Sequence, residues 1–258
     1  MRLCVLGSGS SGNCTYVSSG GTALLVDAGL SGRETFKRIA DCGLDASLVK
    51  SILLTHEHSD HVGALSVLHK RLKADVFANS GTIQGVQKGA GQLSVPWKVF
   101  TTGFSFQVGE IAVEPFTVCH DGLDPVGFVF SHQGARVGVV TDIGVVTSVV
   151  REKLRNCNAI VLESNHDEAM LRAAQRPWAL KQRIAGRQGH LANRHAADLV
   201  VECAGPSLKH VFLAHLSSDC NRPDLAVRTM VDALRKRSLE GVAVSLTFPD
   251  KPGDVWSM

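Results

Sequence analysis

The chain has 258 residues, of which 44% are hydrophobic and 20% are charged, a composition that supports a buried core in a soluble globular protein. The 27 basic residues exceed the 24 acidic ones by only three, so bulk charge does not indicate a nucleic-acid binder, and such a surface would have to be local. At this length an α/β architecture is routinely one domain. We expect a single domain spanning residues 1–258.

Seven cysteines are scattered along the chain without a C-x-x-C pair. Their odd number and their scatter are typical of free thiols in a reducing compartment. The apolar run at residues 3–6 is too short for a signal peptide, and later apolar runs fall short of a membrane span. We therefore expect a cytoplasmic protein without a membrane partner.

A glycine-rich loop follows the first predicted strand, residues 3–6. It reads Gly-Ser-Gly-Ser-Ser-Gly-Asn-Cys over residues 7–14 and precedes a strand near residue 16. Glycine permits positive φ and close approach of the backbone to a ligand or another segment. The loop lacks the lysine and the helix of a phosphate-binding P-loop, so we expect a tight connection with its tip near a functional site. Its candidate substrate contacts are Ser10, Ser11 and Asn13.

A carboxylate ends the next apolar run. Residues 23–26 read Ala-Leu-Leu-Val and are followed by Asp27, and a helix is expected over residues 33–41. An acid at the end of a buried strand is costly unless a positive group or a hydrogen-bond donor meets it. Asp27 could cap a helix, but we favour a role in which it holds a metal-bound imidazole in one tautomer.

Three histidines and an aspartate lie close together after the strand predicted at residues 51–54. Residues 55–61 read Thr-His-Glu-His-Ser-Asp-His and lead into a helix predicted over residues 62–71. Imidazole and carboxylate are ligands of zinc, manganese and ferrous iron. The alternative, a solvated histidine-rich turn, gives no reason for a buried strand to end in this set of ligands.

The spacing within this loop indicates two metal positions. His56 and His58 are two residues apart and can reach one ion from the same side, whereas Asp60 and His61 point toward a second position. Further chelating residues stand at the ends of later apolar runs: His120, Asp142 and His215. We expect the first ion on His56, His58, His120 and Asp142. We expect the second ion on Asp60, His61, His215 and Asp142, so that Asp142 is the bridge.

The rest of the chain alternates between apolar runs and helical periods, which predicts an α/β fold. The further expected strands are residues 75–78, several between 98 and 118, 127–130, 136–140, 159–162, 210–213 and 242–245. The further expected helices are residues 82–88, 168–185 with an interruption at Pro177, 194–203 and 223–237. His132 lies beside the turn of the hairpin over residues 127–140, where we expect it to be solvated.

The pattern His-Glu-His-Ser-Asp-His with later His, Asp and His resembles the metallo-β-lactamase superfamily. The resemblance covers the whole chain and implies a four-layer αβ/βα sandwich with two divalent metal ions, zinc or manganese or iron, at one edge of the sheets. More narrowly, residues 7–13, 163–166, 189–193 and 215–217 resemble the YycJ/WalJ group of small bacterial members. That resemblance implies a metal-dependent nuclease, a 5′-to-3′ exonuclease that acts on DNA rather than RNA.

A two-ion site has a chemistry of its own. Two neighbouring divalent ions lower the pKa of a shared water and clamp the oxygens of an in-line phosphoryl displacement, so the nucleophile would be a metal-activated hydroxide. Asp60 is the candidate that orients or deprotonates this water. His190, in a glycine-flanked loop, is the candidate that protonates the leaving group or grips a phosphate, although it could instead cap the following helix. Asn165, His166 and Asn193 are further candidates for substrate contacts, with loop shaping or helix capping as alternatives.

Two other functions stay open. The same site could hydrolyse a small thioester, lactone or cyclic nucleotide, although no long insertion is present that would enclose a small molecule. A non-catalytic regulatory scaffold is disfavoured because the set of ligands is complete. Basic residues downstream of Ala169 would neutralise phosphates of a nucleic acid or form a solvated helix face: Arg172, Arg176, Lys181, Arg183, Arg187 and Arg194.

Overall fold

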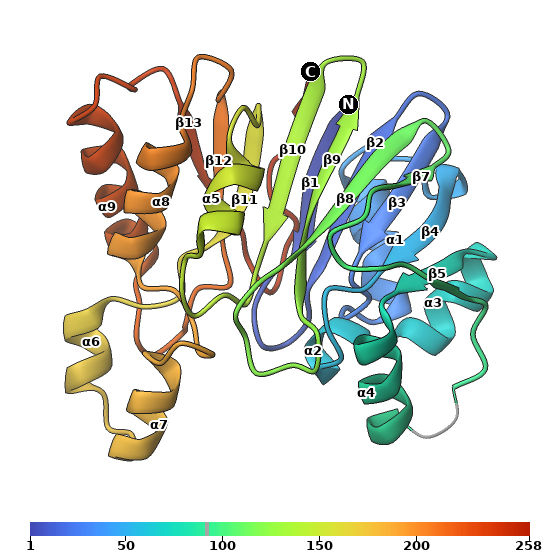
Figure 1. The fold of residues 1–258 in the computed structure, drawn as a ribbon, viewed down its shortest axis with the longest axis horizontal. Helices are drawn as coiled ribbons and strands as arrows, with labels where there is room; N and C mark the ends of the chain where they lie inside the picture. The colour runs from blue at the N-terminus through green and yellow to red at the C-terminus, as the bar shows by residue number, and fades with distance from the viewer. Residues whose placement is uncertain (91–92) are drawn as a thin grey trace.

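The computed structural model describes residues 1–90 and 93–258, and within them two seven-stranded sheets pack face to face. Helices cover the outer face of each sheet, which gives four layers in the order helix, sheet, sheet, helix (Figure 1). The four-layer αβ/βα sandwich predicted from the sequence is therefore confirmed. Each sheet is antiparallel on one side and parallel on the other.

The first sheet has the strand order β14-β1-β2-β3-β4-β5-β6. It is antiparallel from β14 to β3 and parallel from β3 to β6. Its strands are β1 Arg2–Gly7, β2 Cys14–Ser19, β3 Thr22–Val26, β4 Val49–Leu53, β5 Asp75–Ala78, β6 Trp97–Val99 and β14 Trp256–Ser257.

The second sheet has the order β13-β12-β11-β10-β9-β8-β7. It is antiparallel from β7 to β10 and parallel from β10 to β13. Its strands are β7 Phe106–Val108, β8 Ile111–Thr117, β9 Val126–His132, β10 Ala135–Val140, β11 Ala159–Glu163, β12 His210–Ala214 and β13 Ala243–Leu246.

The helices fall into three groups. The first sheet carries α1 Gly32–Asp41, η1 Ala46–Leu48, α2 Ser59–Val62, α3 Leu65–Leu72 and α4 Ser80–Ala90. The second sheet carries α5 Ser148–Leu154, α8 Asn193–Cys203 and α9 Pro223–Arg235. Two short helices, α6 Glu168–Ala173 and α7 Trp178–Ile184, lie at one end of the molecule (Figure 1). Among the described helices, none combines the length and the apolarity that crossing a bilayer requires.

The core strands are apolar on both faces because both faces are covered. Successive residues of a strand point to opposite faces, and in β3 Leu24 faces the layer between the sheets whereas Leu25 faces the layer under α1 and α3. The layer between the sheets also contains Phe128 and Phe130 of β9, both fully buried. Each such side chain stabilises the fold by about 1.5–3 kcal/mol.

The helix predicted over residues 62–71 is instead broken into α2 and α3. The amide of Ala64 donates to the Ala28 carbonyl at 2.8 Å, and the amide of Ala28 donates to the His61 carbonyl at 2.7 Å. The loop after β3 therefore forms hydrogen bonds with the His61 carbonyl and the Ala64 amide. In a continuous helix, these two groups would be paired within the helix. A second difference is α5, which the sequence reading missed because Val149 and Val150 are β-branched and weak helix formers.

His132 was predicted to be solvated, and that expectation is wrong. The residue is only partly exposed, and its Nδ1 lies 2.6 Å from the Ser19 hydroxyl of the first sheet. The hairpin of β9 and β10 contacts the first sheet through His132 and Ser19. This histidine therefore lies at a contact between the two sheets and not on an open surface.

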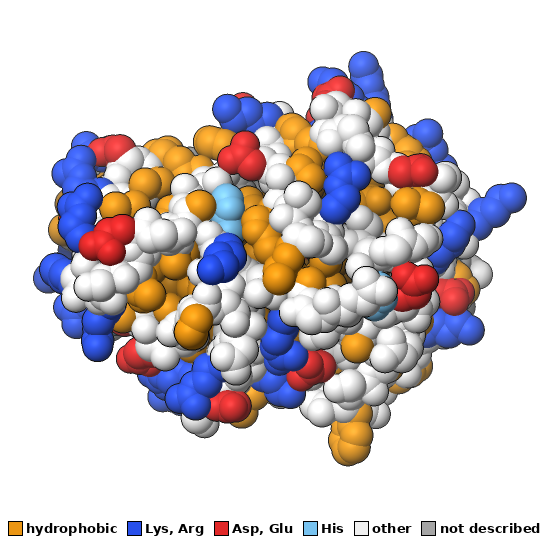
Figure 2. All heavy atoms as spheres, turned by 90° about the horizontal axis from the view of Figure 1, so that it is seen from above, with side chains coloured by type: hydrophobic (Ala, Val, Ile, Leu, Met, Phe, Trp, Pro, Cys, Tyr) orange, Lys and Arg blue, Asp and Glu red, His pale blue; other side chains and the backbone are white. Residues whose placement is uncertain are grey.

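Both chain termini lie at the edge of the sandwich opposite the carboxyl ends of β3, β10 and β12 (Figure 1). Seen from that side, lysine and arginine side chains are interspersed with aspartate and glutamate (Figure 2). This face carries both signs of charge, as the small net charge of the chain predicts.

Candidate metal centre

Three candidate residues lie just after strands and share an unusual backbone conformation. Asp27 follows β3, Asp142 lies two residues after the end of β10, and His215 follows β12. Their φ angles are 64°, 52° and 54°, respectively. Positive φ is uncommon outside glycine and costs on the order of 1–3 kcal/mol per residue. The chain is thereby turned sharply at each strand end, and the three side chains are buried at the same edge of the sandwich.

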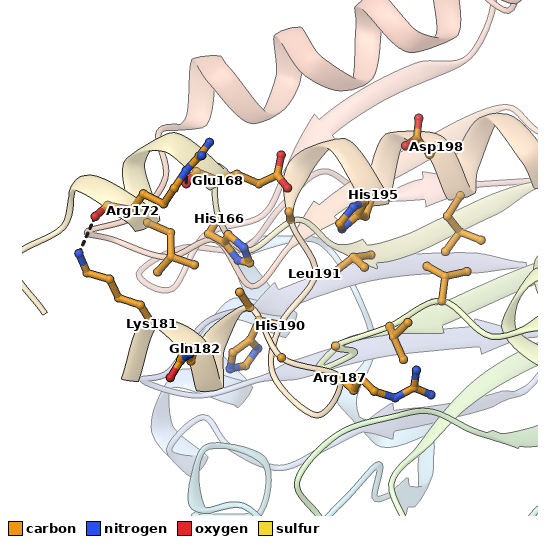
Figure 3. Close-up of a pocket in the computed structure, with 18 of the residues that line it drawn as sticks. His166, Glu168, Arg172, Lys181, Gln182, Arg187, His190, Leu191, His195 and Asp198 are labelled. Atoms are coloured by element: carbon orange, nitrogen blue, oxygen red, sulfur yellow. Dashed lines mark hydrogen bonds between the residues drawn. The ribbon is translucent and has the colours of Figure 1, made fainter. Parts of the chain in front are cut away.

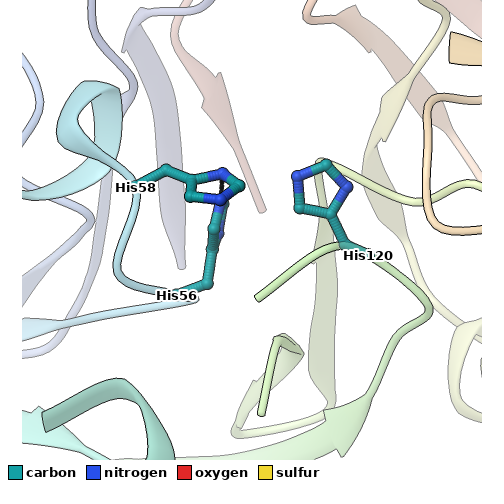
Figure 4. A group of neighbouring side chains, drawn as sticks. All are labelled: His56, His58 and His120. Carbon is teal, nitrogen blue, oxygen red and sulfur yellow. Dashed lines mark hydrogen bonds between the residues drawn. The ribbon is translucent and has the colours of Figure 1, made fainter. Parts of the chain in front are cut away.

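A first cluster consists of His56, His58 and His120 (Figure 4). His56 Nε2 and His58 Nδ1 are 3.0 Å apart, and the ring of His120 lies 5.1 Å from that of His56 and 5.2 Å from that of His58. Nitrogen ligands about 2.0–2.1 Å from one tetrahedral zinc ion lie about 3.3 Å apart. The cluster therefore needs little change to hold one ion.

Hydrogen bonds on the far side of the rings orient this cluster. His120 Nδ1 donates to the Gly189 carbonyl at 3.1 Å, which leaves the lone pair on Nε2. His56 Nδ1 lies 3.0 Å from the Thr55 hydroxyl, and its Nε2 faces His58. Burial lowers the pKa of His56 and of His120, and neutral imidazole is the form that binds a metal.

Asp27 meets His61 in the position that the sequence suggested. Its Oδ2 accepts from His61 Nδ1 at 2.8 Å, and its Oδ1 accepts from the Thr55 amide at 2.8 Å. His61 Nε2 then points to the opposite side, 3.1 Å from Asp142 Oδ2. Burial disfavours the charged ring, but the carboxylates of Asp27 and Asp142 outweigh it and raise the pKa of His61 well above 6.5.

Asp142 lies between the two predicted metal positions. Its Oδ1 is 3.1 Å from His215 Nδ1 and 3.8 Å from His120 Nε2. Its Oδ2 is buried and lies 3.1 Å from His61 Nε2, but within the described residues it has no hydrogen-bond partner of good geometry. An unsatisfied buried carboxylate oxygen is costly, and a divalent cation would satisfy it. The residues of this centre therefore fit metal ions that carry imidazole and carboxylate ligands.

Asp60 is anchored by the glycine-rich loop. Asn13 Nδ2 donates to Asp60 Oδ2 at 3.1 Å, and that oxygen lies 3.5 Å from His61 Nε2 and 4.0 Å from His215 Nε2. Burial opposes ionisation of Asp60, but the nearby His61 outweighs it and lowers the pKa. A Cβ on Gly29 would lie 1.7 Å from the Asp60 carbonyl, so only glycine permits this approach of the backbones.

Glu163, at the end of β11, is a residue of the centre that the sequence reading missed. Its Oε1 accepts from His190 Nδ1 at 2.7 Å and from His215 Nδ1 at 2.9 Å. Its Oε2 accepts from the amides of Ile143 at 2.8 Å and Leu191 at 3.2 Å. The available signal was the one that singled out Asp27, an acid at the end of a buried strand.

Glu163 and the rings of His190 and His215 shift one another's pKa values toward their charged forms. Burial opposes ionisation of Glu163, but His190 and His215 outweigh it and lower its pKa to about 2. Burial likewise opposes charge on His190, and Glu163 raises the pKa of that ring. The pKa of His215 is raised to about 10, because Asp142 and Glu163 outweigh the effect of burial.

The predicted substrate contacts lie in different environments. Ser10 and Ser11 are exposed at the tip of the glycine-rich loop. Asn165 is buried and donates to the His215 carbonyl at 2.8 Å. Asn193 is buried, accepts from the Ser164 hydroxyl at 2.7 Å, and is the first residue of α8 rather than its cap. His166 is buried beside a cavity.

Asp121 is a second acid whose position the sequence did not indicate. Its Oδ1 lies 3.1 Å from His120 Nε2 and 3.5 Å from His58 Nε2, and its Oδ2 pairs with Arg183 of α7. Burial opposes ionisation, but Arg183 and His120 outweigh it and lower the pKa of Asp121. This carboxylate links α7 to the histidine cluster.

The Beta-lactamase superfamily domain model matches residues 22–215 of the chain. That stretch includes every candidate metal ligand from His56 to His215. The exodeoxyribonuclease YycJ of Bacillus anthracis is 36% identical over 256 residues, which cover 98% of this chain and 97% of that protein. The exodeoxyribonuclease WalJ of Streptococcus pneumoniae serotype 2 (strain D39 / NCTC 7466) is 35% identical over 256 residues, covering 98% and 95%.

A solved structure supports the fold independently. The metallo-beta-lactamase fold protein YhfI from Bacillus subtilis superposes with a TM-score of 0.74, covering 99% of each chain at 16% sequence identity. At that identity the likeness concerns the fold alone.

Proposed function

The chain belongs to the beta-lactamase superfamily, and on that premise we propose that it is a binuclear metal-dependent nuclease that removes nucleotides from DNA in the 5′-to-3′ direction. The observation that carries the proposal is the position of Asp142, a buried carboxylate between two groups of imidazoles. The names of the two near full-length relatives support DNA as the substrate. The polarity is the one that the resemblance to the YycJ/WalJ group implies.

The proposed ligands divide between two ions of zinc or manganese, or of iron. His56, His58 and His120 would hold one ion, and Asp60, His61 and His215 would hold the other. Asp142 would bridge them, and Glu163 and Asp27 would fix the tautomers of His215 and His61. Divalent ions at such a centre lower the pKa of water and neutralise the charge that develops on a transferring phosphoryl group.

The remaining chemistry belongs to side chains of this chain. Asp60 has a lowered pKa and is therefore a weak base, so its main contribution is a hydrogen bond that orients the attacking water. His190 has a raised pKa and uses Nδ1 to bind Glu163, which leaves the proton on Nε2 for the leaving oxygen of the strand. A charged imidazole at this place is a suitable general acid.

Cations near the centre support a phosphate-rich substrate. The six basic residues noted in the sequence divide into two sets. Arg176, Arg183 and Arg194 are paired with Asp219, Asp121 and Asp198. Arg172, Lys181 and Arg187 line a cavity beside His190 and remain available for phosphate contacts.

The cysteines support a reducing location. All seven are free thiols in the described structure, as suits the cytoplasm. We retain the cytoplasm as the proposed location.

The proposal is tested by a substrate panel with metal analysis. The protein, supplied with manganese or zinc, is offered 5′-labelled single-stranded and double-stranded DNA, RNA, a chromogenic phosphodiester and a thioester, with and without chelator. We expect mononucleotides to be released from DNA ends only when chelator is absent. Turnover of the thioester with intact DNA would instead identify a small-molecule hydrolase.

Two variants connect the activity to the centre. Asp142→Asn keeps the shape of the side chain, and asparagine tolerates the positive φ, so we expect a folded protein with reduced metal content and at least a roughly hundredfold loss of turnover. The matched control is Glu57→Gln, because Glu57 bonds the Leu123 amide at 2.9 Å, a bond that glutamine can also accept. Equal metal content in Asp142→Asn and the parent protein would contradict the bridging role.

A further inference from the structure

A cavity of about 680 Å³ lies beside the metal centre, between α6, α7, α8 and the loop that carries His190 (Figure 3). Its volume falls within the range of about 300–1,000 Å³ that is typical of small-ligand sites. His190 lines this cavity and also bonds Glu163 of the metal centre. His190 therefore borders both the cavity and the metal centre.

The cavity combines an apolar wall with cations that are open to a ligand. Leu171 and Leu191 form part of the wall and are buried. In the described part of the chain, Arg172 and Lys181 donate to the backbone carbonyls of Glu168 at 3.3 Å and Arg172 at 2.5 Å rather than to carboxylates. Arg187, within the same described residues, has neither an ion pair nor a side-chain hydrogen bond. Each of these three cations could donate a hydrogen bond to a phosphate oxygen.

The acidic residues of the cavity are for the most part neutralised. Glu202 binds Arg151 at 2.5 Å, and Asp198 lies 3.8 Å from Arg194. Glu168 is exposed at the start of α6. The side nearest α7 therefore keeps an excess of positive charge, which suits an anionic ligand.

His166 gives an independent indication that the cavity binds a polar ligand. It lines the cavity, only 2% of its surface is exposed, and its Nδ1 finds no hydrogen-bond partner among residues 1–90 and 93–258. Buried polar atoms are nearly always paired. Figure 3 shows the His166 ring among the side chains that line the cavity.

Trp178, the first residue of α7, lines the same cavity and is 66% exposed. A large aromatic ring left open to solvent beside cations is the usual platform for a nucleobase, and stacking one base is worth about 1–3 kcal/mol. The cavity is also lined by Arg151 of α5 and Leu199 of α8.

We propose that this cavity binds the terminal nucleotide of the DNA strand, with the base against Trp178 and the phosphate among Lys181, Arg172 and Arg187. This inference rests on the proposed nuclease function and deepens it, because it assigns a place to the nucleotide that is removed.

The test measures binding of deoxynucleoside 5′-monophosphates to the metal-loaded protein, by calorimetry and by quenching of tryptophan fluorescence. We expect the monophosphate to bind at least about tenfold more tightly than either the deoxynucleoside or inorganic phosphate. Trp178→Ala and Lys181→Ala should each weaken this binding by roughly tenfold and raise KM for DNA. Phe104→Ala is the matched control, because Phe104 is an aromatic residue with 71% exposure outside the cavity.

The outcomes separate this inference from the proposed function. If DNA is degraded but both variants bind the monophosphate as the parent protein does, the cavity is not the nucleotide site. Binding of inorganic phosphate as tight as that of the monophosphate would also overturn the assignment. If the monophosphate binds and Trp178→Ala weakens that binding while DNA stays intact, the assignment of the cavity as a nucleotide site is supported. The nuclease proposal is then refuted.

Discussion

Replacing Glu163 by glutamine keeps the shape of the side chain and removes its charge. The carboxylate is fully buried and accepts four hydrogen bonds, from the rings of His190 and His215 and from the amides of Ile143 and Leu191. All four partners are donors. The single oxygen of glutamine can serve two of them, and its amide nitrogen must then face the other two.

The expected cost follows from this count. Each buried donor left without an acceptor costs about 1–3 kcal/mol, so two of them destabilise the native state by about 4 kcal/mol. A domain of this size loses about 2–4 °C in Tm for each kcal/mol. We therefore expect Glu163→Gln to lower Tm by about 12 °C.

The assay is differential scanning calorimetry with chelator present, so that metal binding does not contribute to the difference. Glu57→Gln makes the same chemical change where the carboxylate accepts one backbone amide, and we expect its free energy of unfolding to change by less than about 0.5 kcal/mol. A Tm for Glu163→Gln within about 2 °C of the parent protein would refute the view that this carboxylate is matched to four donors.

Two further predictions concern the metal centre. Asp27→Asn keeps a side chain that tolerates positive φ but weakens the hydrogen-bond acceptor of the His61 ring. Metal affinity, measured in competition with a chromophoric chelator, should therefore fall about 10–100-fold. An unchanged affinity would show that Asp27 does not support metal binding. The pKa of His215 is about 10 in the fold against 6.5 for an ordinary histidine, so its contribution to stability is complete below pH 6.5 and is lost as pH rises through 10. The Tm of the chelated protein should therefore fall between pH 6.5 and pH 10, and less so with metal bound, because metal ligands are already deprotonated; a Tm that stays constant over this window would show that the charged ring does not stabilise the native state.

The sequence alone determined the fold class and most of the residues at the centre. A strand that is buried on both faces has an unbroken apolar run in its sequence. A chelating side chain at the end of such a run is therefore easy to recognise. Asp27, His56, Asp142 and His215 were found in this way, and the structure brings them to one edge of the sandwich.

Only the tertiary structure decided which partners the buried polar side chains bind. Glu163 carries the same local signal as Asp27, but its partners His190 and His215 are 27 and 52 residues away, and local periodicity holds no information about such pairs. The sequence left Asn165 and Asn193 open between substrate contacts and loop shaping or helix capping, and the structure buries both side chains in hydrogen bonds within the protein. The cavity beside His190 likewise exists only because residues of α6, α7 and α8 come to line one space. Apolar pattern is a local property of the chain, whereas the pairing of buried polar groups depends on which strand ends the completed sandwich places together.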